Sequence, residues 1–172
     1  MCNAICAGSR QARRYINLDL ASFDSIKQFA AEFRATGLPC HVLLANAGVM
    51  FCPFSRTKEG YEMQWGVNHL GHALLTRLML PHLRQTNGRV VFVSSLAHAG
   101  ARRADYRRVG NPETFLTTHA YSVSKLANVL YARALQNWLH SNGDQIVVVS
   151  LHPGAVNTEL MYVTVCCTHA RR

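Results

Sequence analysis

Residues 41–48 read HVLLANAG, a run of consecutive apolar side chains that ends in a turn of small residues. Such a run is typical of a strand in a parallel sheet, because helices cover both faces of that kind of sheet. Residues 89–93 (RVVFV) and 145–151 (QIVVVSL) have the same character. We therefore predict three buried strands, the first of which covers residues 41–45.

Helical segments separate these strands. Residues 22–35 place phenylalanine and isoleucine side chains on one face at helical spacing, and Ser22 is a suitable N-cap. Residues 60–83 and 119–141 also have the pattern of long helices, whereas residues 106–118 are expected to form a loop. Each predicted strand is thus followed or preceded by a helix.

A further short strand is predicted at residues 14–20 (RYINLDL), so strands and helices alternate along the chain. Alternation of this kind indicates an α/β fold with a parallel sheet and right-handed crossovers. Ligands of such sheets bind in the crevice at the carboxyl ends of the strands. The residues at the carboxyl ends of the predicted strands, or just after them, are Asp19, Leu20, Asn46, Ala47, Gly48, Ser94, Ser95, His152, Pro153 and Gly154.

The sharpest chemical signal is the segment YSVSK at residues 121–125. On a helix, residues four apart lie on one face, so the phenol of Tyr121 and the ammonium of Lys125 project together. A nearby cation favours the phenolate and is expected to lower the pKa of Tyr121 toward the working pH. The pair therefore suits a general acid/base for a hydroxyl or a carbonyl.

Three other positions have both a functional and a purely structural interpretation. A serine hydroxyl at residue 94 or 95 can donate to a developing oxyanion, or it can simply cap the turn after the strand. Asn68 lies inside a predicted helix, where asparagine is unfavourable. It is either exposed, or its amide bonds a backbone carbonyl or a water at a distortion of the helix.

The ordered set of these segments resembles the short-chain dehydrogenase/reductase family over about residues 14–160. The amino-acid sequences of several segments are most similar to those of the retinol dehydrogenase branch. The segments that carry the resemblance are NLDLAS (17–22), ANAGVM (45–50), VNHLGH (67–72), GRVVFVSS (88–95), YSVSK (121–125) and HPGAVNT (152–158).

The resemblance implies a role for each matching position. Tyr121 would be the acid/base, Lys125 would lower its pKa and bond the nicotinamide ribose, and Ser95 would polarise the substrate carbonyl. Asn68 would hold a water that relays protons to Lys125. The cofactor contacts would come from Tyr121 and Lys125 as well. The others would be Asp19 and Leu20 at the adenine, Asn46, Ala47 and Gly48 along the cofactor, and Pro153, Gly154 and Thr158 at the nicotinamide ring.

The implied protein is an NAD- or NADP-dependent oxidoreductase that interconverts an alcohol and a carbonyl. Resemblance to the retinol dehydrogenase branch implies an apolar substrate of the retinol, steroid or prenol kind. The implied fold is one Rossmann-type domain over residues 1–172, with an irregular tail at 161–172. The resemblance leaves open whether the chain forms homo- or hetero-oligomers.

One family feature has no counterpart in this sequence. Family members begin with a strand, a glycine-rich turn of the TGxxxGxG kind and a helix, and the turn holds the cofactor phosphates. The early glycine Gly8 stands in no such pattern. We therefore expect a partial doubly wound sheet without its first two strands, from a shortened form of a longer enzyme. Residues 14–20 would then either move beside residues 41–45 or stay loosely attached.

This gap supports an alternative function. A chain without the phosphate-binding turn would be a catalytically inactive fragment that acts, if at all, by binding or by association with a longer relative. A third hypothesis, a nucleic-acid-binding module, rests on the net charge of +9 and the arginine cluster at 102–108. The other arginines are scattered, so no nucleic acid is expected.

Composition narrows the class of protein further. In 172 residues, 49% are hydrophobic and 16% are charged, which excludes a disordered chain. The apolar runs are too short to span a membrane. Six cysteines without a C-x-x-C pattern indicate neither a disulfide framework nor a zinc site, and fit a reducing compartment, the cytoplasm or the cytoplasmic face of the endoplasmic reticulum. His69 and His72 are expected to be surface or groove residues rather than metal ligands.

Overall fold

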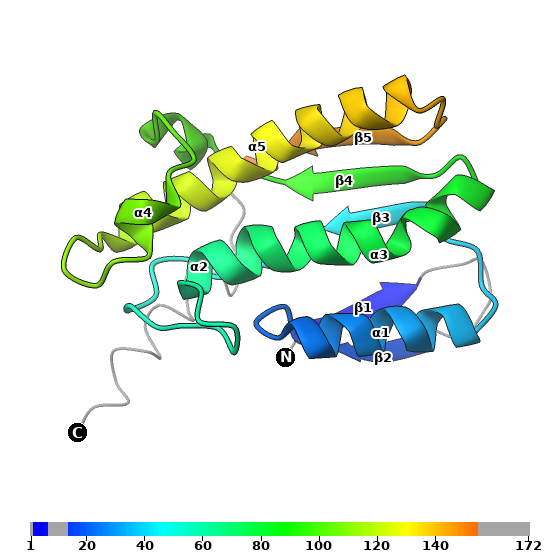
Figure 1. Ribbon diagram of the computed structural model, residues 1–172, viewed down its shortest axis with the longest axis horizontal. Coiled ribbons are helices and arrows are strands. Elements are labelled where there is room, and N and C mark those ends of the chain that lie inside the picture. Colours follow the sequence, from blue (N-terminus) through cyan, green and yellow to red (C-terminus); the bar gives the residue numbers. More distant parts are fainter. Residues whose placement is uncertain (1, 7–13, 155–172) are drawn as a thin grey trace.

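A parallel sheet of three strands lies at the centre of the protein (Figure 1). The computed structural model describes residues 2–6 and 14–154. The strands β3 (Val42–Ala45), β4 (Arg89–Val93) and β5 (Val147–Leu151) follow one another in the order β3-β4-β5. Both pairings are parallel, with Val42 opposite Arg89 and Arg89 opposite Val147. The α/β class and the parallel sheet expected from the apolar runs are confirmed.

Three long helices lie on one side of the strands (Figure 1). They are α1 (Phe23–Ala35), α3 (His72–Gln85) and α5 (Thr117–Ser141). Ser22 caps α1 as expected, because its side chain accepts a hydrogen bond from the backbone N–H of Ser25. The helical pattern of the sequence therefore placed the three helices correctly, with ends that differ by a few residues.

Short helical segments modify two of the expected regions. The predicted helix at residues 60–83 begins later, with α2 (Met63–Trp65), and passes through a π-helical stretch, η1 (Gly66–Gly71), into α3. The predicted loop at residues 106–118 instead contains a short helix, α4 (Tyr106–Val109), whose first turn is capped by the side chain of Asp105. A 3-10 helix, η2 (Leu96–Gly100), follows β4.

The N-terminal strands form a separate two-stranded sheet. β1 (Cys2–Cys6) pairs antiparallel with β2 (Arg14–Leu18), so Cys2 stands opposite Leu18. Both expectations for residues 14–20 are therefore wrong, since this segment neither pairs with β3 nor stays loose. The reason is that β1, a strand that the sequence did not reveal, takes up the backbone hydrogen bonds of β2, while Leu18 and Leu20 are buried.

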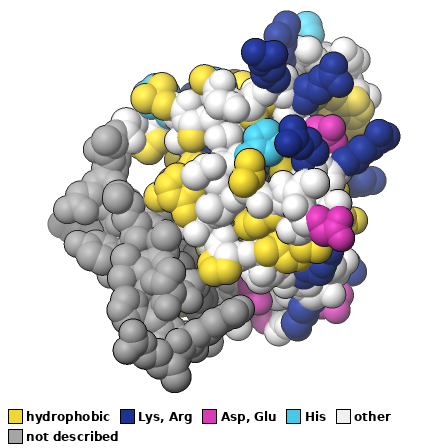
Figure 2. Space-filling model, turned by 90° about the vertical axis from the view of Figure 1, so that its left-hand side faces the viewer, with side chains coloured by type: hydrophobic (Ala, Val, Ile, Leu, Met, Phe, Trp, Pro, Cys, Tyr) yellow, Lys and Arg dark blue, Asp and Glu magenta, His cyan; other side chains and the backbone are white. Residues whose placement is uncertain are grey.

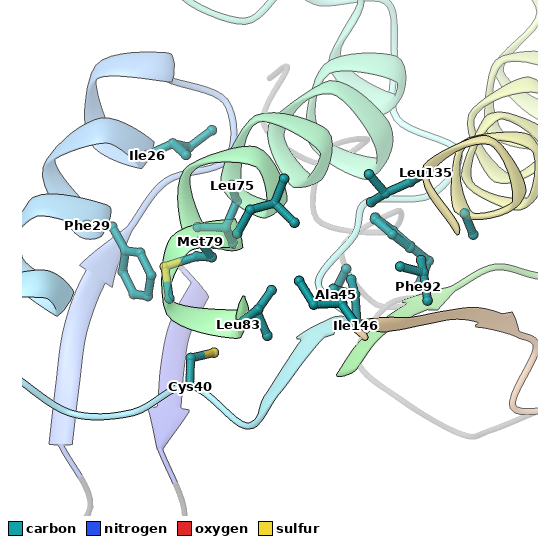
Figure 3. Close-up of a cluster of buried hydrophobic side chains, with 14 of the residues drawn as sticks. Ile26, Phe29, Cys40, Ala45, Leu75, Met79, Leu83, Phe92, Leu135 and Ile146 are labelled. Carbon is teal, nitrogen blue, oxygen red and sulfur yellow. The ribbon is translucent and has the colours of Figure 1, made fainter. Parts of the chain in front are cut away.

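The hydrophobic core lies between the helices and the strands (Figure 3). Phe29 of α1, Met79 and Leu83 of α3, and Phe92 of β4 are each 5% exposed or less. Figure 3 shows these side chains directed into the space between the helices and the strands. At the far end of the sheet, Ile146 and Leu135 close the same cluster.

The opposite face of the sheet is open within the described residues. Val42 and Leu44 of β3 are each 58% exposed, and Val147, Val149 and Leu151 of β5 are 39–44% exposed. The expectation that both faces are covered is therefore wrong for the part of the chain that the structure describes. Strands alternate their side chains between two faces, and the described helices pack on only one of them.

Candidate active site

The carboxyl ends of the parallel strands and the first turns of α5 meet at one end of the molecule. β3 leads into residues 46–49, β4 leads into Ser94 and Ser95, and α5 brings Tyr121 and Lys125. Figure 2 views this end and shows hydrophobic side chains gathered on it, with Lys and Arg side chains mostly along one side. The residues that the sequence singled out after β3 and β4 thus lie at one edge of the sheet.

Tyr121 is 4% exposed, and its phenol lies beside the side chain of Ser95. Burial raises the pKa of the phenol, and the neighbouring hydroxyl of Ser95 lowers it by less. The expectation that Lys125 lowers this pKa is therefore wrong for the protein alone. The reason is that the phenol is desolvated and that the ammonium of Lys125 lies 5.6 Å from the ring centroid, where it donates to a backbone carbonyl.

Lys125 is a buried amine with one backbone partner. Its side chain lies on the same face of α5 as Tyr121, as the i, i+4 spacing predicts. Its Nζ donates to the carbonyl of Val93 at 2.9 Å. Burial lowers the pKa of Lys125 to about 8. A lowered pKa for a lysine beside the end of β4 is typical of a functional site rather than of a surface lysine.

The structure distinguishes the two strand-end serines. Ser94 is buried, and its hydroxyl donates to the carbonyl of Lys125 at 2.8 Å, so it fastens β4 to α5. Ser95 is only half-buried, and its hydroxyl accepts from the N–H of Ala97 while it also contacts the side chain of Tyr121. Of the two, Ser95 is therefore the one placed beside the phenol.

The hydrogen bonds of Asn68 explain why an asparagine occupies a helical position. It is fully buried in η1, where the helix is widened, and its side chain exchanges two hydrogen bonds with the backbone of Val49 at 2.8 and 2.9 Å. Its Nδ2 also donates to the hydroxyl of Ser124, which in turn donates to the carbonyl of Tyr121. The amide thus bonds backbone at a helix distortion, one of the two structural alternatives that the sequence allowed. A water held by Asn68 stays a prediction.

The loop after β3 packs closely against Asn68 and Lys125. A Cβ on Gly48 would lie 2.9 Å from Oδ1 of Asn68 and 3.7 Å from Nζ of Lys125. His72 is buried, and its Nε2 donates to the carbonyl of Ala47 at 2.8 Å. Burial lowers the pKa of His72 to about 4, so the imidazole is neutral. The expectation of a surface or groove residue at position 72 is therefore wrong.

Replacing Gly48 with Ala is expected to destabilise the protein by about 1–3 kcal/mol, because the new methyl group overlaps the buried amide of Asn68. Urea unfolding followed by circular dichroism measures this change. Gly100→Ala is the matched control, since a Cβ there would meet only the flexible side chain of Ser122 at 3.2 Å. Equal stability of the two variants would contradict the close approach described for Gly48.

Five other predicted cofactor residues lie at the ends of described strands: Asp19, Leu20, Asn46, Pro153 and Gly154. The carboxylate of Asp19 accepts from the N–H of Ala21, and Leu20 is buried beside Gly71. Asn46 is exposed. Pro153 and Gly154 are exposed just after β5, and Thr158 lies outside the described residues. Their contacts with a cofactor stay predictions.

Sequence reasoning missed several polar residues of this network. Ser124 and Asn128 lie on α5 three residues after Tyr121 and Lys125, and Asn128 Nδ2 donates to the carbonyl of Asn68 at 2.9 Å. Their helical spacing was a usable signal, because it places them on the face that carries the tyrosine and the lysine. Gln64 and Phe51, which also belong to the site, have no such signal.

Within residues 2–6 and 14–154, no group of three or more His, Cys, Asp or Glu side chains could hold a metal ion. None of the helices described for this chain is long and apolar enough to cross a membrane.

A family model described as short chain dehydrogenase matches residues 2–164. The chain belongs to the short-chain dehydrogenase family. It is 44% identical over 145 residues to retinol dehydrogenase 11 of Homo sapiens, with 84% of this chain and 45% of that protein covered. It is 42% identical over 157 residues to polyprenol dehydrogenase of Danio rerio, with 88% of this chain and 48% of that protein covered.

The chain spans about half the length of the curated relatives it matches. Solved structures share its fold. A putative uncharacterized protein from Mycobacterium paratuberculosis has a TM-score of 0.68 and 38% identity, and the match covers 86% of this chain and 52% of that one. An oxidoreductase from Brucella ovis, solved with a partially ordered NAD, has a TM-score of 0.60 and 24% identity over 89% of this chain and 68% of that one, which shows the fold alone.

Proposed function

We propose that this short-chain dehydrogenase transfers a hydride between NAD or NADP and an alcohol or carbonyl. The observation that carries the proposal is the grouping of Ser95, Tyr121 and Lys125 at the ends of the parallel strands, with the side chain of the serine beside the phenol. The family uses NAD or NADP, and its membership supports this class of reaction.

In the proposed reaction, Tyr121 moves the proton. Its phenol donates to a carbonyl oxygen during reduction, and its phenolate accepts the alcohol proton during oxidation. Burial raises the pKa of Tyr121, so the phenol is the resting form and suits the donor role. Lys125 carries a charge below about pH 8 and favours the phenolate after the proton has left.

Ser95 would donate a hydrogen bond to the substrate oxygen and so stabilise the charge that develops there. Ser94 fastens β4 to α5, which keeps Ser95 beside Tyr121. Asn68 would hold a proton-relaying water near Lys125, and its side chain keeps the loop at Val49 in place.

The residues present fit the nicotinamide half of the cofactor. Gly48 offers bare backbone beside Lys125, because a side chain there would collide with the network. Asn46, Ala47, Gly48, Lys125, Pro153, Gly154 and Thr158 would hold this half, and Asp19 and Leu20 would contact the adenine. When bound, the nicotinamide accepts or supplies the hydride. Residues 1–172 would thus act as one Rossmann-type domain.

An apolar alcohol is the substrate class that we propose. The relatives named retinol dehydrogenase 11 and polyprenol dehydrogenase act, by their names, on long apolar alcohols. In this chain, large apolar side chains that neighbour the site residues in sequence are exposed: Leu96 by 65% and Leu116 by 61%. They offer contact to a hydrocarbon chain next to Ser95 and the start of α5.

A second candidate function is an inactive chain that acts through binding. The sequence has no TGxxxGxG turn, and the described strand β1 belongs to an antiparallel pair instead of a strand–turn–helix unit. The open face of the sheet, with Val42 and Leu44 each 58% exposed, would suit association with another protein.

Titration of residues 1–172 with NADH and with NADPH, followed by the fluorescence of the reduced nicotinamide, separates the two functions. The oxidoreductase proposal expects saturable binding with a dissociation constant in the micromolar range. No binding up to millimolar concentration of either nucleotide would contradict it and favour the inactive chain.

A further inference from the structure

Phe51 stands in a strained backbone conformation directly beside Tyr121. Its φ angle is 55°, in the left-handed region that bulky residues rarely adopt. Among the described residues outside glycine, Asn87 alone shares a positive φ, and asparagine tolerates this region. Strain of this kind persists only where the surroundings impose it, and it gathers at functional sites.

Side chains on two other elements impose this conformation. The N–H of Phe51 donates to Oε1 of Gln64 at 2.9 Å, and Nε2 of Gln64 donates to the carbonyl and the hydroxyl of Thr117 at 3.0 and 3.2 Å. The hydroxyl of Thr117 then donates to the carbonyl of Cys52 at 2.8 Å. The peptide segment 51–52 is therefore held at both ends, by α2 and by the first residue of α5.

Gln64 is itself immobilised. It is fully buried, and its backbone N–H donates to the carboxylate of Glu62, which caps α2 and also accepts from the N–H of Trp65. Glu62 is likewise fully buried, and its own N–H donates to the hydroxyl of Tyr106. Burial and the hydrogen bonds of its amide hold the side chain of Gln64 in place, so it fixes the position of the backbone that it bonds.

The hydrogen bond to Gln64 holds the backbone of Phe51 at the place from which its ring contacts Tyr121. The two ring centroids lie 5.6 Å apart with an interplanar angle of 69°, an edge-on contact. Phe51 is nevertheless 36% exposed. A phenylalanine that served only the core would bury its ring, whereas this one presents apolar surface to solvent next to the proposed acid/base.

We propose that Phe51 is a specificity-determining residue, the apolar wall of the substrate site beside Tyr121, and that Gln64 is the positioning residue that holds it there. The inference rests on the proposed function, because a wall at Tyr121 selects substrates only if a substrate reaches that phenol. The apolar ring of Phe51 suits an alcohol or carbonyl whose carbon skeleton is large and apolar, and it gives no advantage to a small substrate.

Nuclear magnetic resonance of protein labelled in the tyrosine rings tests the positioning part without any need for turnover. The edge contact with Phe51 shifts the ring resonances of Tyr121, so Phe51→Leu removes that shift. Gln64→Met keeps the size of the side chain but removes its hydrogen bonds, and it should move the same resonances. A Tyr121 spectrum that Gln64→Met leaves unchanged would overturn the role of Gln64.

Gln136→Met is the matched control for this spectrum. Gln136 also bonds backbone groups with both atoms of its amide. Its Oε1 accepts from the N–H of Val148 at 2.6 Å, and its Nε2 donates to the carbonyl of Ile146 at 3.4 Å. It joins α5 to β5 far from the site, so its loss should affect stability alone. A Tyr121 shift of equal size in Gln136→Met would mean that the loss of any glutamine that bonds backbone on both sides disturbs the ring, and would overturn the specific role of Gln64.

Steady-state kinetics with retinol and with propan-2-ol test the wall. For Phe51→Ala, KM for retinol should rise by about tenfold with kcat within about threefold, and KM for propan-2-ol should stay unchanged. Phe51→Gly should show the same kinetics and unfold at a higher urea concentration than Phe51→Ala, since glycine adopts positive φ without strain.

The outcomes separate the two proposals. Turnover by the wild-type protein together with equal effects of Phe51→Ala on both alcohols, or with none, contradicts the wall and leaves the oxidoreductase proposal standing. Absence of nicotinamide binding and turnover in the wild-type protein contradicts the proposed function, and with it the selection of substrates by Phe51. The spectrum of Tyr121 still decides whether Gln64 positions the ring.

Discussion

Tyr121→Phe is expected to lower turnover by about 10³-fold while the affinity for NADPH stays within about threefold of the wild-type value. The variant keeps the ring that packs against Phe51 and removes only the hydroxyl beside Ser95. The proton donor is lost, whereas the groups proposed to hold the cofactor remain. Turnover is measured by the absorbance of the reduced nicotinamide, and affinity by its fluorescence.

Tyr131→Phe is the control for this experiment. Tyr131 lies on the same helix, burial raises its pKa as well, and its hydroxyl donates only to the carbonyl of Ala73. Its loss should change turnover by less than about twofold. If Tyr121→Phe retained a tenth of the wild-type rate, Tyr121 would not be the acid/base.

Lys125→Met is expected to stabilise the fold at pH 7 by about 2 kcal/mol, although it should weaken both cofactor affinity and turnover. Burial lowers the pKa of Lys125 from 10.5 to about 8. Below pH 8 the native protein holds this charge in a buried position, which destabilises the fold by about 3 kcal/mol. Loss of the hydrogen bond to Val93 offsets about 1 kcal/mol of the gain.

The pH dependence of the unfolding free energy tests whether the lowered pKa of Lys125 causes the stability gain of Lys125→Met. Between pH 8 and 10.5 the unfolded chain binds more protons than the native protein at this site, so wild-type stability rises with pH. The advantage of Lys125→Met should therefore shrink to about zero by pH 10. Urea unfolding at pH 7 and pH 10 measures both values.

Lys27→Met serves as the control for the charge change, because Lys27 is an exposed lysine paired with Asp24 on the surface of α1. Its effect should be the same at both pH values. A Lys125→Met variant that is less stable than wild type at pH 7, by an amount that does not change with pH, would show that Lys125 is a structural residue with an ordinary pKa.

The parts of the fold that the sequence predicted are those set by local patterns. The apolar run of β4 has the bounds that were expected, and Ser22 begins α1 because its hydroxyl satisfies a free N–H of the first turn. β1 was missed because its five residues, CNAIC, carry no strong strand pattern and depend on pairing with β2. α4 was missed because four residues give no helical period.

The candidate site divides in the same way. Residue types and spacing along one helix predicted that Tyr121 and Lys125 lie together, and the structure confirms this. The direction of the Tyr121 pKa could not be predicted, since it depends on burial and on where the ammonium of Lys125 points. The bonds of Gln64 join segments that are far apart in sequence, so only the fold reveals them.

Chemical-shift mapping of isotope-labelled protein during titration with NADPH tests most directly whether the ends of the parallel strands form a nicotinamide site. The account expects saturable changes concentrated on the backbone of Gly48, the ring of Tyr121 and the amine of Lys125. Saturable binding that leaves these three groups unmoved and shifts residues elsewhere, such as the arginine cluster at 102–108, would contradict it.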